Sequence, residues 1–138
     1  MTFQVVISTE PSLLDIDLIY EYLSRQSYWA KGRSRAMVER SIEHSFCFGM
    51  YLDNRQIGFA RVVSDFTIFG WLMDVFILPE FRGKGYGKQL LTAVFSQPSL
   101  QHLKRWGLNT NDAHGLYEQF GFKTVKDSSI YMERLAPS

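Results

Sequence analysis

"PEFRGKGYGKQLL", from Pro79 to Leu91, places three glycines at alternate positions beside one arginine and two lysines, and then continues into leucines at helical spacing. Glycine allows backbone conformations and close approaches that a side chain forbids, at a cost in conformational entropy. The stretch follows an apolar, strand-like run and precedes an amphipathic helix. Because the first N–H groups of a helix lack partners within the helix, such a position favours an anion. The sequence therefore predicts an anion-binding loop at this position.

The two common nucleotide loops do not fit this spacing. A P-loop needs a glycine five positions before the Gly-Lys pair and a serine or threonine after it. Arg82 stands at that offset from Gly87, and Gln89 follows Lys88. A dinucleotide fingerprint needs glycine or alanine at position 88 and an acidic residue about twenty positions further on, within a repeated strand-helix-strand unit. Spacing excludes both loops.

The order of apolar periods predicts a mixed α/β sheet in one domain, residues 1–138. We expect a strand, two helices, three consecutive antiparallel strands, the glycine loop, a helix, a strand, a short helix and a closing hairpin. Ser12 with Asp15, and later Ser34, are expected to cap the first two helices. The expected strands are 3–8, 45–52, 56–63, 67–78 and 105–110, and the closing hairpin falls within 122–135.

Composition excludes several classes of protein. A net charge of +1 gives no reason to expect a nucleic acid or an anionic membrane as partner. No apolar run approaches the roughly 18 residues of a membrane span, and the first residues lack signal-peptide character, so we expect a soluble, cytoplasmic protein. The single cysteine, Cys47, lies in an apolar run and is expected to be a buried, inert thiol. No metal site is expected.

Two motifs together resemble the GNAT-type N-acetyltransferases. Arg82–Gly87 matches the R-x-x-G-x-G loop that binds acyl-coenzyme A in that family. The A-x-x-L-Y-x-x-x-G-F signature follows at the expected place, supplied by Ala113, Leu116, Tyr117, Gly121 and Phe122. The first motif alone is equally compatible with an exposed surface turn, but the two in order favour the family. The resemblance implies fourth and fifth strands that splay apart, at 71–78 and 105–109.

The resemblance also implies which residues bind acetyl-CoA, as the acyl donor. The pyrophosphate would lie on backbone N–H groups of the loop, and the pantetheine arm would pair with the fourth strand like an added strand. Asn109 is a further candidate, because relatives often carry an asparagine at the neighbouring position, which is Thr110 in this chain. The residues implied are Val75, Phe76, Ile77, Arg82, Gly83, Lys84, Gly85, Tyr86, Gly87, Lys88 and Asn109.

Two residues are candidates for catalysis. Tyr117 matches the family tyrosine whose phenol, protonated at neutral pH, can donate a proton to the departing thiolate. The alternative is a tyrosine that only packs on the sheet. Asp74 is a carboxylate in an apolar strand, so it is expected either to be bonded structurally or to face the cleft as the base. Relatives often place the acidic residue one position earlier, where this chain has Met73.

The acceptor is expected to be a primary amine of a small molecule or a peptide. Tyr28, Trp29 and Asp65 are candidates for the acceptor pocket, the last as an attraction for a cationic amine. We expect direct transfer within a ternary complex and a monomer or homodimer. A non-catalytic acyl-CoA binding or sensing domain remains the main alternative, and an interaction module with an exposed glycine loop is a third.

Overall fold

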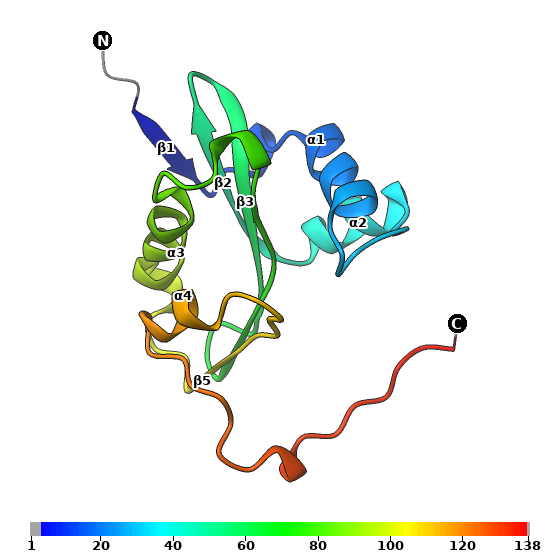
Figure 1. Ribbon diagram of the computed structural model, residues 1–138, viewed down its shortest axis with the longest axis vertical. Helices are drawn as coiled ribbons and strands as arrows, with labels where there is room; N and C mark the ends of the chain where they lie inside the picture. The colour runs from blue at the N-terminus through cyan, green and yellow to red at the C-terminus, as the bar shows by residue number, and fades with distance from the viewer. Residues whose placement is uncertain (1–3, 138) are drawn as a thin grey trace.

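The computed structural model describes residues 4–137, which form a five-stranded mixed sheet with helices on both faces (Figure 1). The strand order follows the chain, β1-β2-β3-β4-β5, with the first three pairings antiparallel and β4–β5 parallel. This confirms the predicted mixed α/β architecture. The strands are β1 Val5–Ser8, β2 Phe46–Leu52, β3 Arg55–Ser64, β4 Phe69–Ile77 and β5 Arg105–Gly107.

Within residues 4–137, four α-helices and a π-helical turn cover the sheet. They are α1 Ile16–Glu21, continued by the π turn Tyr22–Gln26, then α2 Arg35–Glu43, α3 Tyr86–Ser96 and α4 His114–Glu118. Ser34 caps α2 by accepting from the Met37 N–H, as predicted. The first helix begins later than predicted, because Pro11–Leu13 forms a separate 3₁₀ turn capped by Glu10. Asp15 is the cap of α1 and accepts from the Leu18 N–H.

The β2–β3 hairpin turns tightly at Asp53 and Asn54. Both residues have positive φ, 51° and 64°. Two-residue hairpin turns with this twist favour Asn and Asp because these side chains tolerate the left-handed region. The predicted hairpin is therefore confirmed, and it fixes the register of the central strands.

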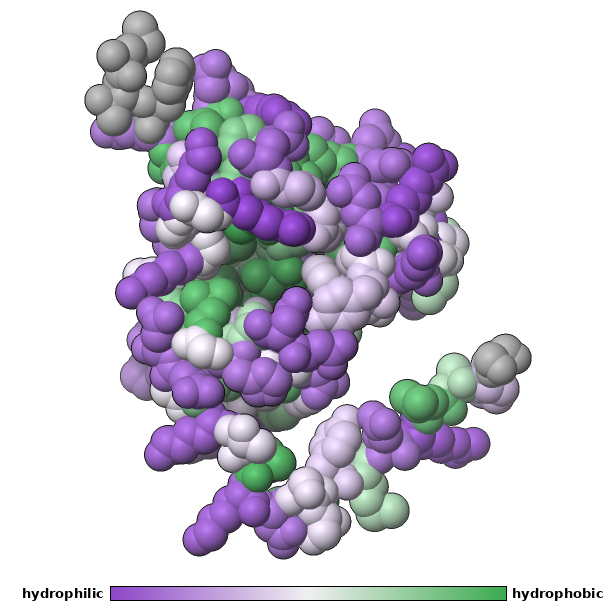
Figure 2. Space-filling view, viewed as in Figure 1, coloured by the Kyte–Doolittle hydropathy of each residue, from purple (hydrophilic) through white to green (hydrophobic). Residues whose placement is uncertain are grey.

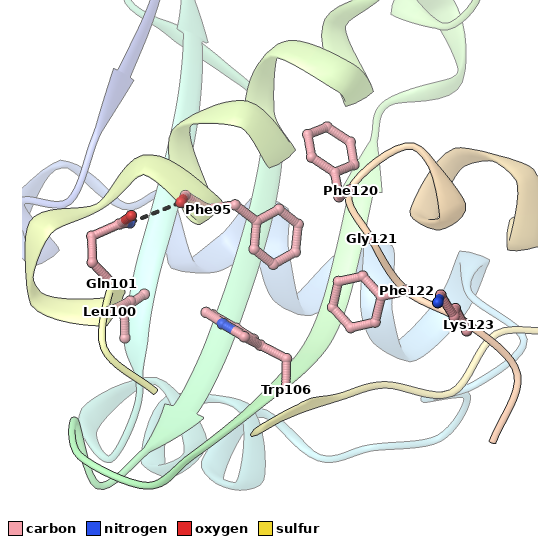
Figure 3. Close-up of a pocket in the computed structure, with 8 residues that line it drawn as sticks. All are labelled: Phe95, Leu100, Gln101, Trp106, Phe120, Gly121, Phe122 and Lys123. Atoms are coloured by element: carbon pink, nitrogen blue, oxygen red, sulfur yellow. Dashed lines mark hydrogen bonds between the residues drawn. The ribbon is translucent and has the colours of Figure 1, made fainter. Parts of the chain in front are cut away.

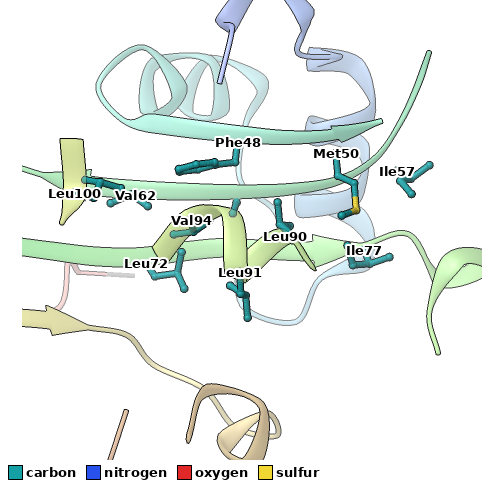
Figure 4. Close-up of a cluster of buried hydrophobic side chains, with 11 residues drawn as sticks. Phe48, Met50, Ile57, Val62, Leu72, Ile77, Leu90, Leu91, Val94 and Leu100 are labelled. Atoms are coloured by element: carbon teal, nitrogen blue, oxygen red, sulfur yellow. The ribbon is translucent and has the colours of Figure 1, made fainter. Parts of the chain in front are cut away.

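Two apolar clusters hold the helices against the sheet, one on each face. Leu90, Leu91 and Val94 of α3 pack on one face against strand residues such as Phe48 and Leu72 (Figure 4). The other cluster joins α1, the π turn and α2 to the opposite face; its buried members are Ile19, Tyr22, Leu23, Ala30, Val38, Cys47, Phe59, Phe76 and Leu78. Cys47 is buried as predicted, and burial raises the pKa of its thiol to about 12.

The predicted closing hairpin is wrong. From residue 123 to 137 the described chain contains only the 3₁₀ turn Ser128–Ile130 and is exposed throughout. It leaves the body beyond α4 and runs away from the sheet (Figure 1). A tight hairpin needs positive φ at its turn, and none occurs in this stretch. The start predicted for the first strand, Phe3, lies outside the described residues.

Within residues 4–137, no helix has the length and apolar character needed to cross a bilayer.

Candidate functional site

The candidate site is a cavity of about 450 Å³ between β4 and the chain that follows β5. β4 and β5 pair only from Phe69–Trp71 to Arg105–Gly107, after which β4 continues to Ile77 with β3 as its neighbour but without β5. The expected separation of the fourth and fifth strands is therefore present. The cavity is lined by Tyr28, Trp29, Arg33, Trp71, Leu72, Met73, Asp74, Val75, Asn109, Thr110, Asn111, Asp112, Ala113 and Tyr117.

A β-bulge at Asp74 shapes the wall that β4 contributes. Phe59 of β3 faces Phe76 and Arg61 faces Met73, so β4 has two residues opposite the single residue Ala60. Asp74 has a φ of +56°, which is uncommon for a residue other than glycine. Bulges re-aim side chains next to functional sites, and such a conformation persists only where the surroundings hold it.

The Asp74 carboxylate is the centre of a buried polar network. Its Oδ1 accepts from the Trp29 Nε1–H at 2.9 Å. Its Oδ2 accepts from Arg33 Nη1 and from Arg61 Nε, both at 2.8 Å. Arg61 is itself buried and also donates to Ser45 Oγ at 3.0 Å. Both carboxylate oxygens already accept hydrogen bonds from side chains of the fold. Of the two roles expected for Asp74, the geometry therefore favours structural bonding over that of a catalytic base.

The network positions the aromatic wall of the cavity. Tyr28 and Trp29 meet edge to face with ring centroids 5.1 Å apart, and both line the cavity. The Trp29 indole is held by Asp74, whereas Tyr28 is largely exposed. Arg33 lies beside them, with one guanidinium nitrogen on Asp74. The loop between α1 and α2 is thereby fixed against β4.

Two arginines of the site were not predicted from the sequence. Arg33 lines the cavity, and Arg61 donates to the Asp74 carboxylate. A usable signal was present for Arg61, because a cation in the apolar run of β3 needs a buried anion, and Asp74 is the acidic residue of the neighbouring strand. Arg33 carried no comparable signal. It stands in a polar loop, where an arginine usually faces solvent.

Tyr117 lies on α4, on the side of the cavity opposite the β4 bulge, and is half-buried. Desolvation, with the nearby Tyr28 and Asp112, raises the pKa of its phenol to about 12. The hydroxyl therefore stays protonated well above neutral pH. Gly121 ends this segment in the left-handed conformation, φ +89°, as the sequence predicts. The Phe122 ring packs edge-on against the Tyr117 ring.

The glycine loop presents a run of free backbone donors at the start of α3. Gly83 and Gly85 have φ of +77° and +81°, and a side chain at either position would meet open space. The glycines are therefore needed for backbone conformation and not for lack of room. The Arg82 N–H donates to the Pro79 carbonyl and the Gln89 N–H donates to the Gly85 carbonyl, but the N–H groups of residues 83–88 donate no backbone hydrogen bond to any described residue. Alternating backbone conformations of this kind form anion-binding concavities.

Arg82 differs from the other six predicted loop donors. Besides its engaged N–H, its side chain turns back into the fold, where Nε donates to the Ile77 carbonyl at 3.0 Å and Nη2 donates to the Tyr22 hydroxyl at 2.6 Å. Arg82 therefore anchors the loop to β4 and the π turn. Lys84 and Lys88 have exposed side chains.

The structure also places the five remaining predicted residues. Asn109 lines the cavity, and the neighbouring Thr110 hydroxyl accepts from the Ala113 N–H at the start of α4. Val75 also lines the cavity, while Phe76 and Ile77 bury their side chains and lie where β4 has lost β5 as a partner. The prediction that Asp65 belongs to the acceptor pocket is wrong. Asp65 lies in the β3–β4 turn, outside the cavity, where its Oδ1 accepts from the N–H groups of residues 67, 68 and 69.

Comparison with known proteins agrees with this geometry. The family model of the acetyltransferase (GNAT) domain matches residues 43–124. A Gibberella zeae protein whose name assigns it to the acetyltransferases is 31% identical, over 88% of this chain and 81% of its own length. A GNAT-family protein of Xanthomonas campestris, known from a crystal structure, is 51% identical with a TM-score of 0.94, covering 97% of this chain and 94% of that one.

A second similar structure is that of a Clostridium acetobutylicum protein, described as a predicted acetyltransferase and solved with acetyl-CoA. It covers 97% of this chain and 96% of its own, with a TM-score of 0.70 and 14% identity, which shows a shared fold. The family model spans β2 to β5, the glycine loop and α4, and so includes the cavity-lining residues from Trp71 to Tyr117 but not those of the α1–α2 loop. The chain belongs to the GNAT acetyltransferase family.

Proposed function

We propose that this protein transfers the acetyl group of acetyl-CoA directly to a primary amine of a small molecule or a peptide. The observation that carries the proposal is the cavity at the separation of β4 and β5, with the Tyr117 phenol on one side and the β4 bulge on the other. When bound, acetyl-CoA would supply an activated acetyl thioester. The residues of this chain would bind it, orient the amine and supply a proton.

The loop is suited to hold the pyrophosphate of acetyl-CoA. Residues 83–88 offer uncommitted N–H groups at a helix N-terminus, where the helix dipole also favours negative charge. The open space at Gly83 and Gly85 allows a ligand to approach the backbone closely. That a Clostridium protein of the same fold was solved with acetyl-CoA supports this assignment.

The edge of β4 beyond Trp71 is suited to the pantetheine arm. Its backbone there has lost β5 as a neighbour, so an extended ligand with amide groups can pair with Val75 and Phe76. The Ile77 carbonyl is already bonded to Arg82. Ile77 would therefore contribute less than its neighbours.

Tyr117 would act as the general acid that protonates the departing thiolate. Its raised pKa keeps the phenol protonated across the physiological range, so the proton is present when the carbon–sulfur bond breaks. We assign Asp74 a positioning role, since it holds Trp29 and Arg33 in the cavity wall and stabilises the bulge.

Acetyl-CoA titration followed by a thiol-release assay with a panel of amines tests the proposal. Tyr117→Phe should retain the affinity for acetyl-CoA within about threefold and lower kcat by about a hundredfold or more, the usual scale of general acid catalysis. Tyr20→Phe is the matched control, because Tyr20 is also half-buried but packs with the α1–α2 cluster. The control should leave both quantities unchanged.

Each result decides between the candidate functions. Undiminished turnover in Tyr117→Phe would remove this residue from the mechanism. Acetyl-CoA binding without turnover across the amine panel would favour a non-catalytic acyl-CoA binding domain. Failure of the wild-type protein to bind acetyl-CoA would overturn the proposal as a whole.

A further inference from the structure

Three charged side chains meet beside the cavity, and their charges do not balance. Arg33 and Arg61 both donate to Oδ2 of Asp74, so two positive charges share one negative charge. The side chains of Asp74 and Arg61 are 0% and 8% exposed, and that of Arg33 is 17% exposed. Buried charges are costly unless they are paired. An excess positive charge at this depth therefore favours an anion in the cavity.

Arg33 is the arginine that still has donors to offer. Arg61 forms hydrogen bonds through all three of its guanidinium nitrogens. Arg33 uses only Nη1, so its Nε–H and Nη2–H donate to no described residue, and Arg33 lines the cavity. Nε and Nη2 form one edge of the guanidinium, and their parallel N–H bonds match the two oxygens of a carboxylate. The unused edge is therefore suited to a carboxylate.

Hydrogen bonds within the α1–α2 loop hold Arg33 in place. The Ser27 hydroxyl is buried and donates to the Leu23 carbonyl at 2.7 Å. Gly32 takes the left-handed conformation, φ +83°, and its N–H donates to the Ser24 carbonyl at 2.9 Å. A group that is fixed before binding loses little conformational entropy when its ligand arrives.

The second acidic residue of the cavity wall lies apart from the two arginines. Asp112 lines the cavity but is exposed and forms no ion pair within residues 4–137. It lies near Tyr117, since its carboxylate helps to raise the pKa of that phenol. The cavity therefore has a basic group beside the β4 bulge and an acidic group on the Tyr117 side.

Aromatic rings form much of the wall between these charged groups. Tyr28 and Trp29 contribute one part of the wall, and Trp71 contributes another. The Trp71 ring lies across β5, where a Cβ on Gly107 would come within 2.5 Å of it, so the ring needs a glycine at 107. In Figure 2 the visible face of the body is hollowed at its middle, with hydrophobic side chains at the bottom of the hollow. Such walls favour an apolar ligand body.

Another hollow of the body has no unbalanced buried charge. It has a volume of about 410 Å³ and is lined mainly by the rings of Phe95, Trp106, Phe120 and Phe122 (Figure 3). Its one charged lining residue, Lys123, is exposed, so solvent screens that charge. The buried excess charge is therefore a feature of the cavity at β4.

We propose that the acceptor is an aminocarboxylate, a small molecule that carries a primary amine and a carboxylate on an apolar body. The inference rests on the proposed acetyl transfer. The carboxylate accepts from the Nε–Nη2 edge of Arg33, and the amine lies on the side of Tyr117 and Asp112. One carboxylate balances the one excess positive charge, whereas a phosphate ester carries a charge of about −1.5 to −2. In the reaction the amine nitrogen bonds to the acetyl carbon, the carbon–sulfur bond breaks, and one amine proton ends on the sulfur.

Steady-state turnover of matched acceptors tests the inference. Glycine, β-alanine and L-phenylalanine are each compared with their own carboxamide, which keeps the amine and the body but lacks the negative charge. For at least one pair, kcat/KM of the wild type should be about tenfold or more higher for the acid, the scale of a hydrogen bond between charged groups. The carboxamides have the less basic amines, so a preference for the acid cannot arise from a larger neutral fraction.

Substitutions at Arg33 connect this preference to its guanidinium. Arg33→Gln should raise the KM of the acid by about tenfold or more and leave the KM of the carboxamide within about threefold. Arg33→Lys keeps a positive charge beside Asp74 but lacks the two-nitrogen edge, so it should restore only part of the preference. A purely structural role would change acid and carboxamide alike. The control is Arg35→Gln, which removes an exposed arginine of α2 outside the cavity and should keep the wild-type preference.

The inference and the proposed acetyl transfer fail in different ways. Turnover of amines with no preference for the acid in any pair refutes the aminocarboxylate and leaves acetyl transfer intact. If no amine is turned over, acetyl transfer itself is overturned, and the carboxylate site is judged by binding alone.

The N-acetyl forms of the three acids serve for that binding measurement, followed by NMR of the Arg33 Nε–H, whose signal is identified by its loss in Arg33→Gln. At least one N-acetyl acid should shift this signal, and its carboxamide should not. No shift with any acid, or an equal shift with the carboxamide, refutes the carboxylate site.

Discussion

Asp74 shows how much one buried carboxylate holds in place. It is fully buried, lies in a left-handed conformation and is the common partner of Arg33, Arg61 and Trp29. We predict that Asp74→Asn lowers the free energy of unfolding by about 3–5 kcal/mol, because the change leaves two guanidinium groups without their counter-charge. Chemical denaturation measures this loss.

Asp17→Asn is the control for that measurement. Asp17 also pairs with an arginine, Arg35, but both side chains are exposed. An exposed pair contributes only about 0–1 kcal/mol. Equal losses in the two variants would contradict a stabilising role for the buried Asp74 network.

The Tyr117 side chain makes the stability of the protein depend on pH. The pKa of its phenol is about 12 in the folded protein, against 10.0 in the reference state. Between these values the folded state keeps the proton that the unfolded state has lost, so stability falls as pH rises. We predict that the free energy of unfolding falls more steeply from pH 10 to 12 in the wild type than in Tyr117→Phe. Chemical denaturation at each pH measures this free energy. If it falls equally steeply with pH in the two proteins, the phenol is not desolvated.

At the scale of the element, the turn into α3 depends on backbone conformation. Gly85 is the cap residue of α3 and has a φ of +81°, with open space where a side chain would go. Alanine there costs about 1–2 kcal/mol of backbone strain, and relief of the strain would turn the loop N–H groups away from their present directions. We predict that Gly85→Ala weakens acetyl-CoA binding by about fivefold or more in calorimetric titration.

Gly115→Ala separates backbone strain from a general effect of adding a methyl group. Gly115 lies within α4, has open space around it and is not among the glycines with positive φ. Alanine favours a helix interior over glycine by about 1 kcal/mol. The variant should therefore be at least as stable as the wild type and keep its affinity for acetyl-CoA. A loss of affinity equal to that of Gly85→Ala would refute the conformational explanation.

At the scale of the whole molecule, the proposed acetyl-CoA site couples ligand binding to folding. A ligand that binds the folded chain and not the unfolded one stabilises the folded state by mass action. We predict that the melting temperature of the wild-type protein rises with the concentration of acetyl-CoA. Scanning calorimetry over a series of acetyl-CoA concentrations measures the change. A melting temperature that does not depend on acetyl-CoA would contradict the proposed cofactor site.

The sequence alone determined the features that depend on local physics. The glycine loop, the Ser34 cap, the turn at Asp53 and the left-handed Gly121 all follow from conformational preferences that neighbouring residues cannot easily override. The order of the elements followed from apolar periodicity, and the separation of the fourth and fifth strands followed from the resemblance to the family. These features sufficed to indicate the cavity and its Tyr117.

Only the tertiary structure decided which polar groups already form hydrogen bonds and ion pairs within the fold, and which path the end of the chain takes. Asp74 is held by Arg61 on the next strand and Arg33 in a distant loop, while Asp65, predicted for the site, caps its own turn. Arg82 faces the fold and not the ligand side. The residues after Phe122 look like a hairpin locally, but a strand needs a neighbouring strand, and the tertiary path of the chain, not composition, decides whether it has one.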